Sequence, residues 1–178
     1  MNKILIILLV LFMCSCSKEE LQTLKPESHI TFSLEASTAQ KLNKSRAGTP
    51  GIEQYNENRI DHIDVFLFDE LGNCLLYPET SQVVQSGTEV SLALFSEQAD
   101  IIKGKTLELY VLANSSLNRS ALQGKTRKQL FETVQENANT FNSSVFTPQT
   151  NFLMDGSLNS VTIDTVNKQL GNLKLNRA

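Results

Sequence analysis

Strict alternation of apolar and polar residues is the feature that most restricts the fold of this chain. In the stretch HITFSLEA, the apolar residues Ile30, Phe32, Leu34 and Ala36 are separated by polar ones. Successive side chains of a β-strand point to opposite faces, so a period of two places all the apolar groups on one face. The stretch therefore predicts a strand that buries one side.

The same period recurs further along the chain. The segments TEVSLALF at 88–95 and TLELYVLAN at 106–114 alternate in this way, and we expect each to bury a single face. Two apolar runs flank Asp69–Asn73, where Gly72 suits a turn, and they predict a hairpin. Later short apolar runs predict further strands at NFLMDGS, SVTID and LKLNRA.

One segment, KTRKQLFETVQENANTF, breaks the period of two. Its apolar residues recur at spacings of three and four, which is typical of an amphipathic helix, and Thr126 followed by Gln129 resembles a capping box. We expect this helix to pack on the sheet. The pattern as a whole predicts an all-β fold, a β-sandwich of about seven strands with one inserted short helix.

The amino terminus has the form of an export signal. The apolar run Ile4–Met13 follows Lys3 and is shorter than the roughly 20 residues that span a bilayer. A lipoprotein signal is cut just before a cysteine that receives a lipid. Cutting before Cys16 leaves small Ser15 at the last signal position, whereas cutting before Cys14 would leave bulky Met13 there. We therefore predict Cys16 as the lipid attachment site.

Composition excludes several other classes of function. The net charge of −3 and the pI near 5.4 provide no basic stripe for nucleic acid. With Cys14 in the signal and Cys16 acylated, Cys74 has no partner for an intramolecular disulfide. His29 and His62 lack companions at ligand spacing, so we expect no metal and no cofactor. We find no nucleophile motif, marked acid pair or phosphate loop, and we expect no enzymatic activity.

Two polar segments flank the first predicted strand. Residues 17–26 are unpatterned and suit a tether. The long stretch STAQKLNKSRAGTPGIEQYNENR at 37–59 contains Gly48, Pro50 and Gly51, which disfavour a packed element and leave the backbone accessible to a protease.

From Ile30 to its end, the chain resembles the N-terminal domain of FimA-type fimbrillins, the fimbrial subunits of certain anaerobic Gram-negative bacteria. The resemblance rests on the Arg46-Ala47 junction, V-L-A-N at 111–114 and M-D-G at 154–156, which follow one another in this order behind the lipoprotein signal. It implies a transthyretin-like β-sandwich. Family members have a second β-sandwich domain, which we expect to be absent from this chain.

The resemblance also implies how the protein matures. The precursor would be cut after Arg46, with Ala47 as the first mature residue, although Lys41, Lys44 and Arg59 offer other cleavable bonds in the same stretch. The strand that contains Ile30, Phe32, Leu34 and Ala36 would then leave and be replaced by a strand from another subunit. The domains are accordingly a signal peptide at 1–15, a tether and prosegment at 16–46, and a sandwich domain at 47–178.

Three functional classes fit these features. The first is a structural subunit of a surface fimbria that supports adhesion, with other fimbrial subunits as its partners. The second is a minor anchor or tip subunit that stays lipid-anchored, and the third is a surface lipoprotein that binds glycans or proteins. All three place the protein at the bacterial outer membrane and cell surface, with host proteins or glycans as candidate ligands and no nucleic acid.

Overall fold

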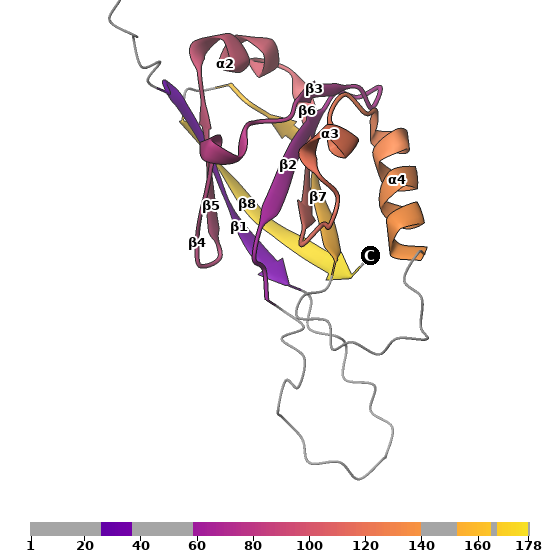
Figure 1. Cartoon of the computed structure of the whole chain (residues 1–178). Helices are drawn as coiled ribbons and strands as arrows, with labels where there is room; N and C mark the ends of the chain where they lie inside the picture. The colour runs from indigo at the N-terminus through magenta and orange to yellow at the C-terminus, as the bar shows by residue number, and fades with distance from the viewer. Residues whose placement is uncertain (1–25, 37–58, 140–152, 165–166, 178) are drawn as a thin grey trace, which may run out of the picture.

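The computed structural model describes residues 26–36, 59–139, 153–164 and 167–177. Within these ranges the strands form one continuous eight-stranded sheet in the order β3-β2-β6-β7-β8-β1-β5-β4 (Figure 1), which confirms the all-β prediction. The strands are β1 (Ser28–Ala36), β2 (Ile63–Phe68), β3 (Cys74–Leu76), β4 (Val83–Ser86), β5 (Glu89–Leu94), β6 (Thr106–Ala113), β7 (Met154–Thr162) and β8 (Asn167–Arg177).

Helical segments are more numerous than the one that the sequence predicted. They are the short 3-10 helix η2 (Thr80–Gln82) and the α-helices α2 (Ser96–Ile102), α3 (Arg119–Leu122) and α4 (Arg127–Asn139). Among the described residues, none of these helices is long and apolar enough to cross a membrane.

The sheet curls so that its two halves pack face to face. One half is β3-β2-β6-β7 and the other is β8-β1-β5-β4, and they join where Met154 and Asp155 of β7 pair with the last residues of β8. A single apolar core contains residues of both halves. In β5, Val90, Leu92 and Leu94 are each at most 1% exposed, as the alternation of TEVSLALF predicted.

The glycine of the M-D-G motif lies in β7 against the backbone of β8. A Cβ atom built on Gly156 would lie 2.2 Å from the backbone oxygen of Lys174 and 2.8 Å from Cδ2 of Leu173. No side chain fits at such a distance, so the position requires glycine for close backbone approach. The motif thus has a structural explanation at the junction between the two halves of the sheet.

The outer face of β2 and β6 is covered by α3 and α4, so β6 buries both of its faces. The prediction that TLELYVLAN buries a single face was therefore wrong. α4 begins with the predicted capping box, in which the backbone N–H of Thr126 donates to Oε1 of Gln129 (3.0 Å) and the N–H of Gln129 donates to Oγ1 of Thr126 (3.4 Å). This second core comprises Phe66, Phe68, Tyr110, Leu112, Leu122, Leu130 and Val134.

The predicted hairpin is present as β2 and β3, and Asp69 organises its turn. The carboxylate of Asp69 accepts hydrogen bonds from the N–H groups of Leu71 (3.0 Å) and Asn73 (2.8 Å) and from the Asn73 amide, while Gly72 has φ of 80°. These bonds, the one from the Asn73 side chain above all, lower the pKa of Asp69. The turn is therefore specified by local hydrogen bonding.

The sequence predicted two short strands between 151 and 164, but β7 is one strand with a bulge. Its pairing with β6 shifts between Leu107 opposite Val161 and Leu109 opposite Leu158, and Ser160 lies in the bulge with φ of 56°. A bulge interrupts the alternation of buried residues without ending the strand, which explains the misreading.

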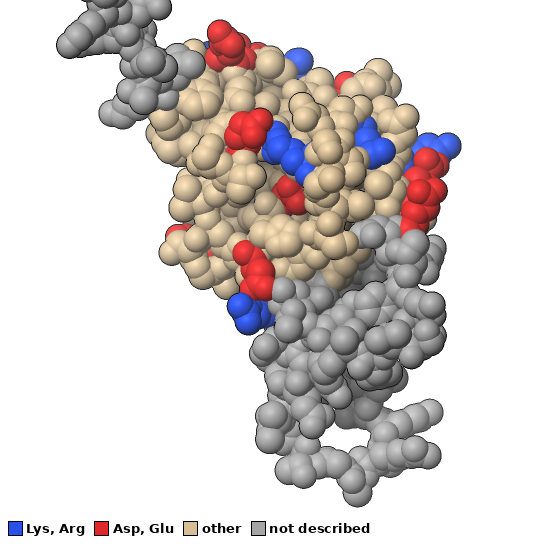
Figure 2. All heavy atoms as spheres, viewed as in Figure 1, with Lys and Arg blue, Asp and Glu red and all other residues tan. Residues whose placement is uncertain are grey.

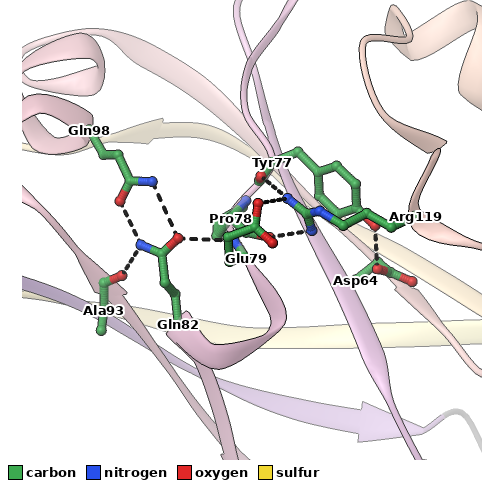
Figure 3. Close-up of polar contacts among 8 residues, drawn as sticks. All are labelled: Asp64, Tyr77, Pro78, Glu79, Gln82, Ala93, Gln98 and Arg119. Carbon is green, nitrogen blue, oxygen red and sulfur yellow. Dashed lines mark hydrogen bonds and ion pairs between the residues drawn. The ribbon is translucent and has the colours of Figure 1, made fainter.

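Two polar clamps fasten the segment between β3 and β4 to its surroundings. In the first, the Arg119 guanidinium stacks 4.0 Å from the centre of the Tyr77 ring and donates to the backbone oxygens of Pro78 (2.7 Å) and Tyr77 (2.8 Å) (Figure 3). The same group forms an ion pair with Glu79 at 3.1 Å. The clamp thereby holds this segment against α3.

The second clamp joins β5 to η2 and α2. Nε2 of Gln82 donates to the backbone oxygen of Ala93 (2.8 Å) and to Oε1 of Gln98 (2.6 Å) (Figure 3). Gln82 is only 4% exposed, so these bonds satisfy a buried amide. They attach β5 to the fold independently of its neighbour β1.

We predict that Gly156→Ala destabilises the protein by about 3 kcal/mol, because the added methyl group cannot fit against β8 without moving backbone. Gly171→Ala is the matched control, since a Cβ at Gly171 meets nothing within 4 Å, and it should change stability by less than about 0.5 kcal/mol. Urea unfolding of both variants provides the measurement. Equal losses would contradict the role assigned to Gly156.

Candidate functional site

The strand β1 lies inside its half of the sheet, with a neighbour on each edge. It runs antiparallel to β5, from Ser28 opposite Leu94 to Ser33 opposite Glu89. It runs parallel to β8, from His29 opposite Asn167 to Ala36 opposite Leu175. Both of its backbone edges are therefore engaged, and in the order of strands β5 and β4 join the rest of the sheet only through β1.

The inward face of β1 is almost fully buried. Ile30, Phe32 and Leu34 are 2%, 2% and 3% exposed, and Ala36 packs partly buried beside them. The residues between them face outward, and of these His29 and Glu35 are exposed. β1 thus contributes two ladders of backbone hydrogen bonds and a row of apolar side chains to the main core.

A bulge in β8 divides the parallel ladder. Thr31 lies opposite Gln169 and Ser33 lies opposite Asn172, so β8 contains one residue more than β1 between these pairs. The extra residue in β8 lies opposite Phe32, the largest side chain of β1. Because a bulge marks a fixed point in the pairing, it defines the register in which a strand can lie in this groove.

Beyond β1 the described chain resumes at Arg59, where Asn114 fixes it. Asn114 follows the end of β6 with φ of 59°, and its Oδ1 accepts from the N–H of Asp61 (2.8 Å) while its Nδ2 donates to the oxygen of Arg59 (2.7 Å). Its own N–H donates to the oxygen of His62 (3.0 Å). The last residue of V-L-A-N therefore anchors the segment that leads into β2.

The predicted site residues fall into two groups. Ile30, Phe32, Leu34 and Ala36 lie together on one face of β1, whereas Cys16, Arg46 and Ala47 lie outside the described residues, so their roles stay predictions. β1 begins at Ser28, one residue before the stretch HITFSLEA that predicted it. Extending the period of two backwards by one step from Ile30 would have found that Ser28 shares the inward face.

The remaining polar residues of the motifs have structural partners. The hydroxyl of Tyr110 donates to Oδ2 of Asp155 at 3.0 Å, and burial together with the nearby Asp155 carboxylate raises the pKa of Tyr110. Burial likewise raises the pKa of the Cys74 thiol. Among the described residues no group of three or more His, Cys, Asp or Glu is placed to hold a metal ion.

The molecular surface provides a hollow of about 740 Å³ between the β2–β3 turn and α4. Four of its charged residues form two ion pairs: Nε of Arg127 contacts Oε2 of Glu108 at 2.6 Å, and Lys128 faces Glu132 at 3.9 Å. On the face drawn in Figure 2, positive and negative residues are interspersed, with no patch of a single sign.

Comparison with known proteins identifies a family. Residues 28–176 match the family model described as the major fimbrial subunit protein (FimA). A comparison with curated proteins found no match.

Three solved structures are similar to this chain at low sequence identity. The tip fimbrial protein Mfa3 from Porphyromonas gingivalis, truncated at its C-terminus, is 14% identical with a TM-score of 0.44, over 85% of this chain and 48% of that one. A fimbrial assembly protein from Parabacteroides distasonis is 11% identical with a TM-score of 0.40, over 84% and 52%. A candidate cell adhesion protein from Bacteroides eggerthii is 19% identical with a TM-score of 0.47, over 86% and 41%. This chain therefore spans about half the length of these proteins or less.

We predict that Phe32→Asp lowers stability by more than about 4 kcal/mol, because it removes a buried ring and places a charge in the core. Ser33→Asp, next to it on the outward and half-buried face, is the matched control and should cost less than about 1 kcal/mol. Thermal melting followed by circular dichroism compares the two variants. Equal melting temperatures would refute the inward orientation of Phe32.

Proposed function

The chain belongs to the FimA family of major fimbrial subunit proteins, and from this premise we propose that it is exported as a lipoprotein and assembled into a surface fimbria by strand exchange. In this proposal Cys16 carries the lipid, and cleavage after Arg46 makes Ala47 the first mature residue. β1 then leaves its groove and a strand of another subunit replaces it. The family is one of structural proteins and not of enzymes.

The observation that carries the proposal is the position of β1 in the sheet and in the chain. β1 is fully paired inside the sheet, yet only the segment 37–58 joins it covalently to everything that follows. A single cut in that segment, such as one after Arg46, would convert an intramolecular strand into a separate peptide. Asn114 holds the chain beyond the segment at Arg59 and Asp61, so the cut need not loosen β2.

Energetics explain why a replacement strand is needed. Burying a side chain of the size of Ile30, Phe32 or Leu34 stabilises a fold by about 1.5–3 kcal/mol. Together they approach the entire net stability of a small domain, which is about 5–15 kcal/mol. An empty groove would therefore be unfavourable, and an incoming strand of the same alternating pattern restores both the apolar contacts and the backbone hydrogen bonds.

Cleavage also changes how β1 competes with a strand of another subunit for the groove. Before the cut, β1 competes at the high effective concentration that covalent linkage provides. After the cut, its occupancy of the groove follows mass action, and a strand presented by a neighbouring subunit can displace it. Proteolysis would in this way control when subunits polymerise. Lipid on Cys16 would hold the precursor at the outer membrane, and the assembled fimbria would support adhesion.

The experiment that tests this function is N-terminal sequencing of protein recovered from sheared cell-surface filaments. We predict that the recovered subunit begins at Ala47 and that Arg46→Ala abolishes both this terminus and incorporation into filaments. Lys44→Ala is the matched control and should leave both unchanged, because Lys44 is not the predicted cleavage site.

Other outcomes would assign another role. A protein that stays whole and acylated at Cys16 within filament preparations would be an anchor or tip subunit. A protein that remains acylated and never enters filaments would contradict the structural role and favour a surface-binding lipoprotein.

A further inference from the structure

β1 does not fill the whole groove in which it lies. Its inward face carries Ser28, Ile30, Phe32, Leu34 and Ala36 in order along the strand. The middle three are large and apolar, but the first is a serine whose residue is only 7% exposed. A small polar side chain thus occupies a buried position that the alternating pattern would assign to a large apolar one.

A hollow of about 190 Å³ lies beside this serine. Its floor is apolar and buried, since Ile30, Leu94 and Ile163 are 2%, 1% and 5% exposed, and Ala99 of α2 lies on one side. Among the described residues, the exposed Glu27, Ser96, Asp100 and Lys103 also line it. We call this hollow, with Ser28 at its edge, the Ser28 pocket.

The hollow has an apolar floor and a polar rim, and it leaves room beside Ser28 for a larger apolar side chain. A side chain such as leucine at position 28 would bury apolar surface there, whereas serine buries little. β1 is therefore a weaker occupant of its own groove than the groove permits.

The pairing of strands decides which residue of a strand bound in the groove lies at the pocket. Ser28 pairs with Leu94, the next residue His29 pairs with Asn167, and the N–H of Glu27 donates to the oxygen of Leu94 at 3.0 Å. The pocket thus adjoins the first inward position of the ladder with β5, one residue before the ladder with β8 begins. A strand bound along these ladders places a side chain at the pocket.

Resting on the strand-exchange function above, we propose that the Ser28 pocket selects the incoming strand. Its partner is a strand of another fimbrial subunit that carries a large apolar side chain at the position equivalent to Ser28. Such a strand binds the groove more tightly than β1 does. After cleavage the incoming strand is therefore favoured over β1. Before cleavage, covalent linkage keeps the more weakly binding β1 in place.

The first test asks whether the pocket can be filled in the uncleaved chain. The variants Ser28→Ala, Ser28→Val and Ser28→Leu should show melting temperatures that rise with the size of the side chain. Thr31→Leu, on the outward face, is the matched control for added hydrophobicity and should show no such gain. Melting temperatures of the Ser28 series that stay level or fall would overturn the inference.

The second test measures binding after Arg-specific cleavage. A fluorescent peptide of residues 26–36 and its Ser28→Leu version compete with β1 for the groove of the cleaved protein. We expect the Ser28→Leu peptide to bind about tenfold more tightly. Equal or weaker binding would overturn the inference and leave the exchange function standing. Entry of neither peptide would refute the exchange function itself, and with it the proposed partner.

Discussion

The double pairing of β1 is the interaction on which the rest of this structure depends. In the order of strands, β5 and β4 are connected to β8 and β7 only through β1. Its backbone completes one half of the sheet, and Ile30, Phe32 and Leu34 fill the core between the two halves. The first strand of the described chain is thus a central strand of the fold, and the proposed maturation removes a structural element from the middle of a sheet.

Other contacts attach the neighbours of β1 through groups outside this strand. Gln82 bonds to Ala93 of β5 and to Gln98 of α2, so β5 keeps an attachment that does not involve β1. At the other end of the groove, Asn114 fixes the chain where it re-enters the fold. Leu92 and Leu94 also belong to the core shared with the opposite half of the sheet. The groove would therefore stay shaped for a replacement strand.

Alternation in the sequence predicted β1 and β5 because each of these strands buries one face. It failed for β6, where α3 and α4 cover the second face, and for β7, where a bulge at Ser160 shifts the period. The parallel pairing of β1 with β8 joins opposite ends of the chain, and no local pattern carries that information. At the site, the alternation in the sequence correctly predicted that Ile30, Phe32 and Leu34 face inward. The Ser28 pocket was not, because its walls come from β5, α2 and Ile163.

In the proposed function, β1 separates from its groove after cleavage while the opposite half of the sheet keeps its fold. Amide hydrogen exchange, measured residue by residue before and after Arg-specific cleavage, tests this separation. We expect cleavage to lower the protection of β1 and of the β5 and β8 amides that face it, while amides in β2 and β6 stay as protected as before. A uniform loss of protection throughout the sheet, or no change in β1, β5 and β8, would contradict it.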